Sequence, residues 1–358
     1  MTNPLDAEGL RTRVQKALDD HLSMQAARLD ELGPDLSSMM DVITELLRGG
    51  KRLRAAFCYW GWRGAGGPDC PQIVEAAGAL ELFQAAALLH DDVMDDSDTR
   101  RGHPAAHRRM ASLHRGNGWT GDGERFGVAA AILAGDLCLA WSDEMLNRSR
   151  LEPARLDRGR EVFDLMRTQL MGGQYLDVLE QVLTEADGGG TTERARRVIR
   201  FKSAKYSIEQ PLLLGGALAG ASPGLTASYS AYGLPLGEAF QLRDDVLGVF
   251  GDPGETGKPA GDDLREGKRT VLVAEALTNA SPSQAAQVRR RLGDPRLDAE
   301  GVAVLREIIV ETGALDAVER LVEQLVEEAS LALQRADVAE PARAVLSELV
   351  EAATARQA

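Results

Sequence analysis

Paired aspartates are the residues of this sequence whose types and spacing point most directly to chemistry. Asp91, Asp92 and Asp95 follow an apolar run in "LLHDDVMDDSDTRRG", residues 88–102. On a helix, Asp91 and Asp95 lie one turn apart on the same side, and Asp92 is turned by about 100°. Carboxylates this close repel each other and raise one another's pKa, so they require a counterion. Mg²⁺ prefers oxygen ligands and is commonly held by one or two carboxylates together with substrate phosphates.

A second pair, Asp244 and Asp245, follows another apolar run in "FQLRDDVLG", residues 240–248. A glutamine precedes each aspartate cluster on the same side of its helix: Gln84 lies seven residues before Asp91, and Gln241 lies three residues before Asp244. Two aspartate pairs on separate buried helices predict a site that binds several metal ions and a diphosphate. The alternative is two unrelated acidic helix ends.

Basic residues are interleaved with these carboxylates. The segments "GGKRLRA" and "TRRGH" carry five of them, Lys51, Arg52, Arg54, Arg100 and Arg101. Three lysines occur in mixed surroundings, Lys202, Lys258 and Lys268. Arginine suits bidentate phosphate recognition, whereas lysine acts as a point charge. Each residue alone is typical of a solvated surface. Together with the aspartates they indicate one diphosphate held through metal ions and another held directly by arginine and lysine.

Helices must position these groups, because the apolar residues recur with a period of 3.6 and no sustained alternation is present. A buried helix is expected over 71–98, where the sequence is apolar on most sides. Further helices are expected over 127–150, 157–183, 193–221, 225–250, 268–278, 298–313 and 314–335. Irregular segments are expected over 114–127, 185–192 and 250–268, the last long enough to be a functional loop. This pattern predicts one all-α domain over residues 1–358.

Composition excludes several classes of partner. The net charge of −14 argues against nucleic acid, which needs a basic face. The three cysteines, Cys58, Cys70 and Cys138, lack metal-site spacing and are expected to be reduced thiols. The start of the chain does not read as a signal peptide, and no uninterrupted run of about 18 apolar residues predicts a membrane span. A cytoplasmic location is therefore expected.

From about Gly49 to Thr270, the chain resembles the trans-isoprenyl diphosphate synthases, the family that makes farnesyl, geranylgeranyl and longer polyprenyl diphosphates. The resemblance rests on several motifs in the family's order: "GGKRLR", "LLHDDVMDDSDTRRG", "GGQYLD", "FKSAKYS", "FQLRDDVLG" and "GKPAGDDLREGKRT". It implies a single-domain bundle of long helices around a central cavity. The motif-bearing core would span about 45–275, with C-terminal helices over 298–356.

The resemblance also implies roles for individual residues. The metal ligands would be Asp91, Asp92, Asp95, Asp244 and Asp245, holding Mg²⁺, about three ions per active site. Isopentenyl diphosphate would be bound by Lys51, Arg54, Gln84 and Arg101. The allylic diphosphate would be bound by Arg100, Lys202 and Lys258. The reaction centre would be lined by Gln174, Ser203 and Gln241, with Lys202 beside it.

The second motif departs from that of some relatives, because Gly248 stands where they keep a third aspartate. Metal binding should then depend more on Asp244. Asp263 and Lys268 fall in the loop that closes over the site in the family, and Lys268 would be a substrate-binding residue. His90 is interpreted as a structural histidine.

The implied reaction is condensation of isopentenyl diphosphate with an allylic diphosphate (dimethylallyl, geranyl or farnesyl) by ionisation, attack and proton loss. A homodimer is also implied. Two alternatives remain: a class I terpene cyclase, which needs no second diphosphate pocket, and a non-catalytic subunit of a heteromeric synthase.

Product length should depend on the helix before the first motif. Ala86 and Ala87 are small where farnesyl synthases often carry an aromatic ring, and Phe83 could form the floor of the product tunnel. These residues favour geranylgeranyl diphosphate, with farnesyl second and longer products third. The alternative is that Phe83 only packs in the core.

Overall fold

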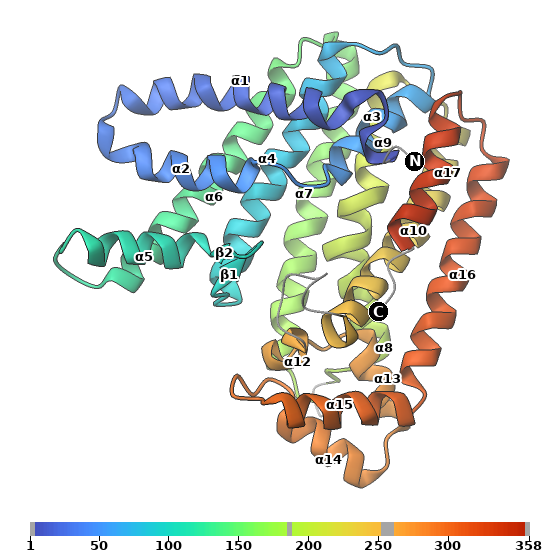
Figure 1. Ribbon diagram of the computed structural model, residues 1–358. Coiled ribbons are helices and arrows are strands. Elements are labelled where there is room, and N and C mark those ends of the chain that lie inside the picture. Colours follow the sequence, from blue (N-terminus) through green and yellow to red (C-terminus); the bar gives the residue numbers. More distant parts are fainter. Residues whose placement is uncertain (1–3, 185–187, 252–260, 355–358) are drawn as a thin grey trace. The chain divides into compact units, whose positions relative to one another are not determined.

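The computed structural model describes residues 4–184, 188–251 and 261–354, which are built almost entirely of helices (Figure 1). The chain groups into two compact units. Unit 1 comprises Met1–Gly159 and Leu214–Gly220, and unit 2 comprises Arg160–Leu213 and Ala221–Ala358. The all-α fold class is confirmed. A single domain over 1–358 stays a prediction.

Unit 1 is organised around α4. Its elements are η1 (Pro4–Gly9), α1 (Leu10–Asp30), η2 (Pro34–Leu36), α2 (Ser37–Leu47), α3 (Leu53–Gly64), α4 (Pro71–Met94), β1 (Thr99–Arg100), β2 (His103–Pro104), α5 (Ala106–Gly116), α6 (Gly123–Arg148), the start of α7 (Pro153–Val182) and most of α9 (Gln210–Ala219). Helix α4 packs against α6, α3 and α1. It is buried through most of its length, as expected of a helix that is apolar on most sides.

Two local features of unit 1 differ from the sequence-based expectation. Helix α6 begins at Gly123, inside the glycine-rich segment expected to be irregular, because the Asp122 side chain accepts hydrogen bonds from the backbone of Glu124 and Arg125. A two-stranded antiparallel ribbon, β1 with β2, follows α4. Strands of two residues are too short to leave an alternating pattern in the sequence.

Unit 2 contains the rest of α7 and α9, α8 (Thr192–Val198), the π-helix η4 (Ile199–Glu209), α10 (Pro223–Phe250), α12 (Asp262–Glu266), α13 (Val271–Asn279), α14 (Pro282–Arg291), α15 (Ala299–Glu311), α16 (Ala314–Arg335) and α17 (Ala342–Thr354). The helix expected over 193–221 is present, but it contains the π-helical stretch. The segment expected to be irregular over 250–268 includes the short helix α12.

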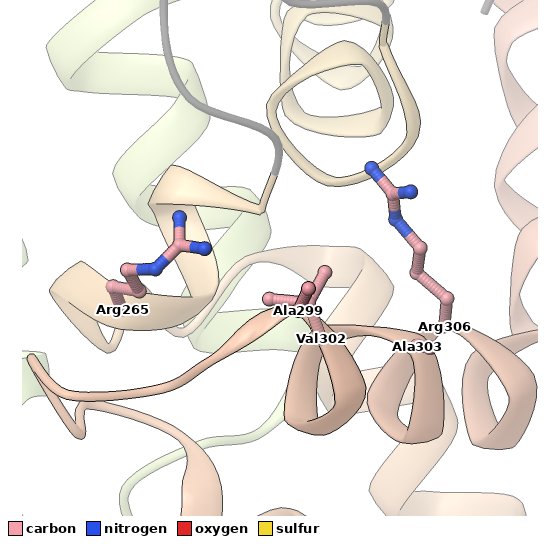
Figure 2. Close-up of a pocket in the computed structure, with 5 residues that line it drawn as sticks. All are labelled: Arg265, Ala299, Val302, Ala303 and Arg306. Carbon is pink, nitrogen blue, oxygen red and sulfur yellow. The ribbon is translucent and has the colours of Figure 1, made fainter.

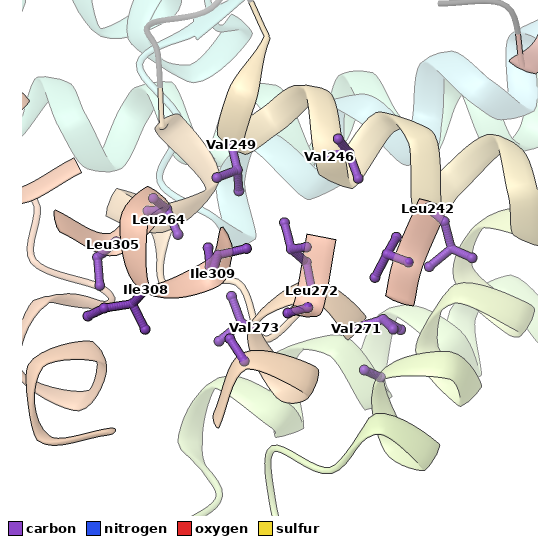
Figure 3. Packing of buried hydrophobic residues seen from close by; sticks show 14 of the residues in the cluster. Leu242, Val246, Val249, Leu264, Val271, Leu272, Val273, Leu305, Ile308 and Ile309 are labelled. Atoms are coloured by element: carbon purple, nitrogen blue, oxygen red, sulfur yellow. The ribbon is translucent and has the colours of Figure 1, made fainter. Parts of the chain in front are cut away.

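The core of unit 2 explains which side of α10 is left for chemistry. Leu242, Val246 and Val249 form one apolar stripe of α10, buried with residues of α12, α13 and α15 (Figure 3). Burying such side chains is worth about 1.5–3 kcal/mol each. A second stripe, about 100° from the first, contains Gln241, Asp244, Asp245 and Gly248, which recur at i, i+3, i+4 and i+7. The core therefore holds α10 with its aspartates to one side.

Two helices of the described chain, α4 and α6, have the length and hydropathy to cross a membrane. Helices in the core of a protein can have the same length and hydropathy. In the apolar 18-residue stretch of α4, 72% is buried, and in that of α6, 44% is buried. The absence of a membrane span stays a prediction.

Candidate functional site

The first aspartate motif lies at the C-terminal end of α4. Asp91 and Asp92 stand in the last turns, and the Asp95 backbone N–H donates to the Asp91 carbonyl at 2.8 Å and caps the helix. Burial raises the pKa of Asp92, although a hydrogen bond from Arg100 opposes this shift. The C-terminal end of a helix carries partial negative charge. Carboxylates at this place therefore gain from a nearby cation.

The β1–β2 hairpin supplies one such cation. Arg100 Nε donates to Asp92 Oδ1 at 2.8 Å, and its Nη2 contacts the same oxygen. The Arg100 guanidinium also lies 3.8 Å from Asp91 Oδ2. Arg100, expected to bind diphosphate, is therefore paired with the first two metal-ligand candidates in this structure.

Arg101, the next residue, is directed to a different cluster. It has a positive φ of 53°, and its Nη1 donates to the Leu46 carbonyl at 3.1 Å. Its guanidinium lies against Gly50, where an added Cβ would be 3.5 Å away. Desolvation lowers the pKa of Arg101, and the nearby charges of Arg52, Arg100 and Arg54 lower it further, against the opposing charge of Glu81, which pairs with Arg52 at 3.2 Å. Cations crowded in this way would be stabilised by an anion.

The remaining candidates of unit 1 surround this cation cluster or face the motif. Lys51 is exposed in the segment between α2 and α3, and Arg54 is half-buried in the first turn of α3. The N-terminal end of a helix favours anions. Gln84 is half-buried, on the same side of α4 as Asp91 and Asp95. The predicted isopentenyl diphosphate ligands therefore lie in the segment before α3, on α3, on α4 and in the hairpin.

The second motif lies on the polar stripe of α10. Burial, reinforced by the charge of Asp263, raises the pKa of Asp244 to about 7. The same two causes raise the pKa of Asp245 to about 8, against a hydrogen bond from Gln241 Nε2 to Asp245 Oδ1 of 2.8 Å. These carboxylates are costly to ionise without a cation. Gln241 thus contacts a metal-ligand candidate.

Lys268 lies beside this motif. Its Nζ is 3.3 Å from Asp263 Oδ1 and 2.6 Å from Glu266 Oε2, and its charge also acts on Asp245. Lys258 lies outside the described residues. Among the unit 2 candidates, the structure therefore brings Gln241, Asp245 and Lys268 together.

The π-helix η4 carries Lys202 and Ser203 and packs closely on α7. A Cβ added at Gly173 would be 2.5 Å from Lys202 N, so α7 approaches the η4 backbone at a distance only glycine permits. Lys202 Nζ forms an ion pair of 2.6 Å with Asp177 Oδ2. Gln174 and Ser203 are half-buried. Asp177 belongs to the quoted "GGQYLD" motif, but sequence reasoning assigned it no role.

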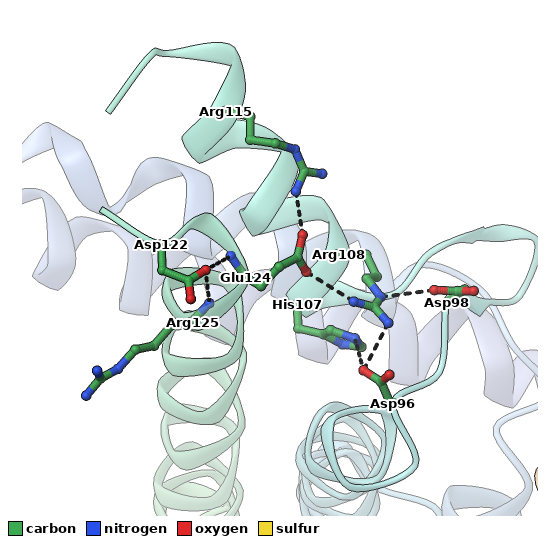
Figure 4. A network of polar contacts seen from close by, with 8 residues as sticks. All are labelled: Asp96, Asp98, His107, Arg108, Arg115, Asp122, Glu124 and Arg125. Carbon is green, nitrogen blue, oxygen red and sulfur yellow. Dashed lines mark hydrogen bonds and ion pairs between the residues drawn. The ribbon is translucent and has the colours of Figure 1, made fainter. Parts of the chain in front are cut away.

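An arginine that the sequence reasoning missed holds the segment after the first motif (Figure 4). Arg108 contacts Asp96 at 2.9 Å, Asp98 at 3.0 Å and Glu124 at 3.1 Å. These contacts tie the turn before β1 to α5 and α6. Arg108 stands in α5, 10 and 12 residues after Asp98 and Asp96, which precede that helix, so no helical spacing indicates its role.

His90 contacts the neighbouring helix α6. Its Nε2 lies 3.2 Å from the Ile132 carbonyl oxygen and 3.4 Å from Asp136 Oδ1. These are packing contacts of the kind expected of a structural histidine.

One cavity of about 220 Å³ in unit 2 contains no predicted site residue (Figure 2). Arg265 and Arg306 flank it, and Ala299, Val302 and Ala303 of α15 line it. Arg265 belongs to the quoted motif "GKPAGDDLREGKRT", but none of the candidate site residues lines the cavity.

The donor sets of both motifs suit Mg²⁺. Among the residues that the structure describes, no three His, Cys, Asp or Glu side chains converge on a single metal position. Mg²⁺ does not need such a cage, because it is commonly bound by one or two carboxylates plus phosphate oxygens and water. The pairs Asp91–Asp92 and Asp244–Asp245 offer the oxygen ligands this requires.

A sequence model described as polyprenyl synthetase matches residues 36–309. The chain belongs to this family. Among curated relatives, the geranylfarnesyl diphosphate synthase of Aeropyrum pernix is 32% identical over 80% of this chain and 84% of its own. The octaprenyl diphosphate synthase of Escherichia coli is 30% identical over 88% and 89%.

A solved relative of this polyprenyl synthetase is the geranylgeranyl pyrophosphate synthase of Corynebacterium glutamicum, complexed with isoprenyl diphosphate and magnesium. It is 41% identical, covers 97% of this chain and 99% of its own, and has a TM-score of 0.92. The predicted family and enzyme class, a trans-prenyltransferase making isoprenyl diphosphates, are confirmed.

Proposed function

We propose that this polyprenyl synthetase condenses isopentenyl diphosphate with an allylic diphosphate and makes geranylgeranyl diphosphate. The observation that carries the proposal is the divergence of Arg100 and Arg101. Arg100 pairs with the carboxylates of the first motif, and Arg101 joins a cluster of cations beside Gly50. One hairpin thus serves a cation-binding cluster and an anion-binding cluster, as an enzyme for two diphosphates requires.

Different residues bind the two diphosphates and the metal ions. Isopentenyl diphosphate is bound by Lys51, Arg54, Gln84 and Arg101. The allylic diphosphate is bound by Arg100, Lys202 and Lys268, and Lys258 is proposed for the same role from the sequence. Mg²⁺, about three ions, would be held by Asp91, Asp92, Asp95, Asp244 and Asp245, and when bound it supplies Lewis-acid stabilisation of the leaving diphosphate.

The chain's own residues assist each step of the reaction. The allylic carbon–oxygen bond breaks, and its electron pair leaves with pyrophosphate, which Arg100 and Lys202 stabilise electrostatically. The double bond of isopentenyl diphosphate, held in place by Arg54 and Arg101, attacks the allylic cation and forms the new carbon–carbon bond. Loss of a proton to pyrophosphate completes the product. Gln174, Ser203 and Gln241 present polar oxygens to the cation.

The product assignment rests on α4. The relatives named above make products of different lengths, so family membership does not decide this property. Ala86 is fully buried and Ala87 half-buried, and Phe83 is fully buried three and four residues before them. Small residues near Asp91 leave room for a chain longer than farnesyl, and Phe83 limits it.

A homodimer is part of the proposal, and α6 supports it. Ile132 and Leu133 are 41% and 55% exposed on this helix, although the helix is strongly apolar. Adjacent exposed apolar side chains that form a contiguous patch commonly mark protein interfaces. A cytoplasmic location is proposed from composition alone.

Turnover of purified protein tests the proposal. Mg²⁺, isopentenyl diphosphate and each of dimethylallyl, geranyl and farnesyl diphosphate should yield pyrophosphate and geranylgeranyl diphosphate, identified by mass spectrometry. Asp91→Ala and Asp244→Ala should each lower the rate by at least about 100-fold, while Asp20→Ala on the surface of α1 should not. Turnover of the allylic substrate alone would instead indicate a terpene cyclase.

A further inference from the structure

The three cations of the segment 49–55 stand close together in sequence, but one of them is turned into the protein. Lys51 is exposed and Arg54 is half-buried, whereas Arg52 is only 5% exposed. Arg52 has a left-handed backbone conformation, with φ of 54° and ψ of 38°, at the N-terminal end of α3. Such a conformation is uncommon outside glycine and persists where the surrounding structure holds it. The side-chain contacts of Arg52 show what holds this segment.

The guanidinium group of Arg52 joins three helices. Its Nη1 donates to Glu81 Oε2 of α4 at 3.2 Å, and its Nη2 donates to Gln15 Oε1 of α1 at 2.6 Å. Nη2 also contacts the Leu47 carbonyl oxygen at the end of α2. Arginine suits this position because its donors are fixed in a planar fork, whereas lysine has one ammonium group on a flexible stem. Arg52 is therefore committed to protein acceptors.

The two side chains that bind Arg52 also bind the backbone of its segment. Glu81 Oε1 accepts a hydrogen bond of 3.2 Å from the Ala55 N–H, in the first turn of α3. This N–H group belongs to the set that a helix leaves without an intrahelical partner. Gln15 Oε1 accepts a hydrogen bond of 3.2 Å from the Gly49 N–H. Glu81 and Gln15 thus hold the two ends of the segment.

Glu81 also affects the cation cluster that contains Arg101. The charge of Glu81 raises the pKa of Arg101, against desolvation and the charges of neighbouring arginines, which lower it. Glu81 is 7% exposed, so its charge and that of Arg52 are paired inside the protein. Glu81 stands three residues before Gln84, on the same side of α4. Helix α4 therefore carries a proposed isopentenyl diphosphate ligand and, one turn earlier, the group that fixes α3.

We propose that Arg52, Glu81 and Gln15 are positioning residues for isopentenyl diphosphate. They fix the segment so that Lys51 and Arg54 present their cations to one diphosphate, and they do not themselves contact the substrate. A binding site with fixed cations avoids the cost of ordering them when the substrate binds. The inference rests on the proposed function for the identity of the substrate. The alternative is a network that stabilises the fold without favouring either substrate.

Comparison of the two substrates tests this role. Glu81→Gln keeps the shape of the side chain but removes the charge that holds Arg52. It should raise the KM for isopentenyl diphosphate by at least about tenfold, and the KM for the allylic diphosphate by less than about twofold. Calorimetry with isopentenyl diphosphate alone should show the same loss of affinity, and this measurement needs no turnover. Equal changes in the two KM values, or no change, would overturn the inference.

A double variant separates positioning from stability. Arg52→Met and Glu81→Met each leave one buried charge without its partner and should lower the unfolding temperature. The double variant, with methionine at both positions, leaves neither charge and should unfold at a higher temperature than either single variant. Its KM for isopentenyl diphosphate should still be at least about tenfold above that of the wild type. If this KM recovered together with stability, the network would be structural only and the inference would fail.

Gln15 offers a conservative rescue. Gln15→Leu removes the acceptor shared by Arg52 and Gly49 and should raise the KM for isopentenyl diphosphate by at least about threefold. Gln15→Glu keeps an acceptor at this place and should leave that KM within about twofold of the wild type. A Gln15→Leu variant with unchanged KM would contradict the proposed contact.

The matched control is Gln25→Leu, on the same helix. Gln25 Nε2 donates to Glu144 at 2.6 Å, away from the segment 49–55. This variant should lower stability and leave both KM values within about twofold, and a selective effect like that of Gln15→Leu would overturn the inference. Wild-type protein that binds isopentenyl diphosphate, weakened by Glu81→Gln, but does not condense it would refute only the proposed function.

Discussion

Five aspartates stand between residues 91 and 98, and their partners in the structure separate them. Asp91 and Asp92 lie beside Arg100, and Asp95 caps α4. Asp96 and Asp98 are bound by Arg108 and serve to hold the turn. In the second motif, Asp245 is buried, and its pKa rises to about 8. Asp244 shares this cost of ionisation without a metal ion, since its pKa rises to about 7, but the rise is larger at Asp245.

This cost predicts how stability depends on pH in protein stripped of divalent cations. An unfolded aspartate has a pKa of about 3.9. Between about pH 4 and pH 8 the folded state keeps a proton on Asp245 that the unfolded state has lost, so the free energy of unfolding falls as pH rises. Asp245→Asn should therefore stabilise the metal-free protein by more than about 1 kcal/mol at pH 8 and leave it unchanged near pH 4.

Thermal unfolding across this pH range measures the effect, with Asp20→Asn on the exposed surface of α1 as the control. Added Mg²⁺ with pyrophosphate should stabilise the wild type, so that the wild type becomes more stable than Asp245→Asn. If Asp245→Asn differed from the wild type in stability by the same amount at pH 4.5 and at pH 8, this explanation would be contradicted.

At the scale of elements, the close packing of α7 on η4 positions Lys202. The backbone of η4 lies 2.5 Å from the place of a Cβ at Gly173, whereas nothing lies within 4 Å of one at the adjacent Gly172. π-Helical turns are frequent at functional sites because they re-aim side chains. Here the π-helix presents Lys202 to Asp177.

The two neighbouring glycines give a matched pair of variants. Gly173→Ala should cost about 1–3 kcal/mol, because the backbone of η4 must move, and should raise the KM for the allylic substrate by displacing Lys202. Gly172→Ala should stabilise α7 by up to about 1 kcal/mol, since alanine favours helix and meets no neighbour. Urea unfolding and steady-state kinetics measure both, and similar effects for the two variants would rule out the proposed contact.

Helix α4 carries the prediction on product length. Ala86→Phe should shorten the product to farnesyl diphosphate, because an aromatic ring fills volume that a prenyl tail cannot cross. Phe83→Ala should lengthen it by removing the floor. Chromatography of the products from one primer compares the variants with wild type. Unchanged length for Phe83→Ala would place the floor elsewhere and leave Phe83 as a core residue.

At the scale of the whole molecule, exposed apolar side chains on α6 contrast with a net charge of −14, which keeps copies apart. Association through such a face must therefore depend on apolar burial. In a symmetric dimer both subunits would use the same face, so each of these side chains would be buried in both copies.

Leu133→Lys should convert the dimer to a monomer, because each copy loses about 1.5–3 kcal/mol of burial and gains a charge at the contact. Light scattering after size-exclusion chromatography measures the mass. Val310→Lys on α15, a valine of similar exposure at 54% against 55%, should remain dimeric. A dimeric Leu133→Lys protein would exclude this face.

The sequence by itself determined the properties that depend on neighbours along the chain. The helical period predicted α4, α6, α7, α10, α15 and α16, and the spacing of Asp91, Asp92 and Asp95 placed them on adjacent sides of one helix. The order of the motifs was sufficient to identify the family, because both a motif and its place in that order depend only on the linear sequence. Asp244 and Asp245 were found in the same way.

Only the tertiary structure decided which groups meet through space. Arg100 and Arg101 are adjacent in sequence, yet a ribbon of four paired residues turns them to different clusters. Asp263 reaches Gly248 because Leu264 and Val249 share a core. Arg108 contacts Asp96 and Asp98 because the chain turns after α4 and brings α5 beside them. Such contacts depend on packing between distant segments, for which local periodicity carries no signal.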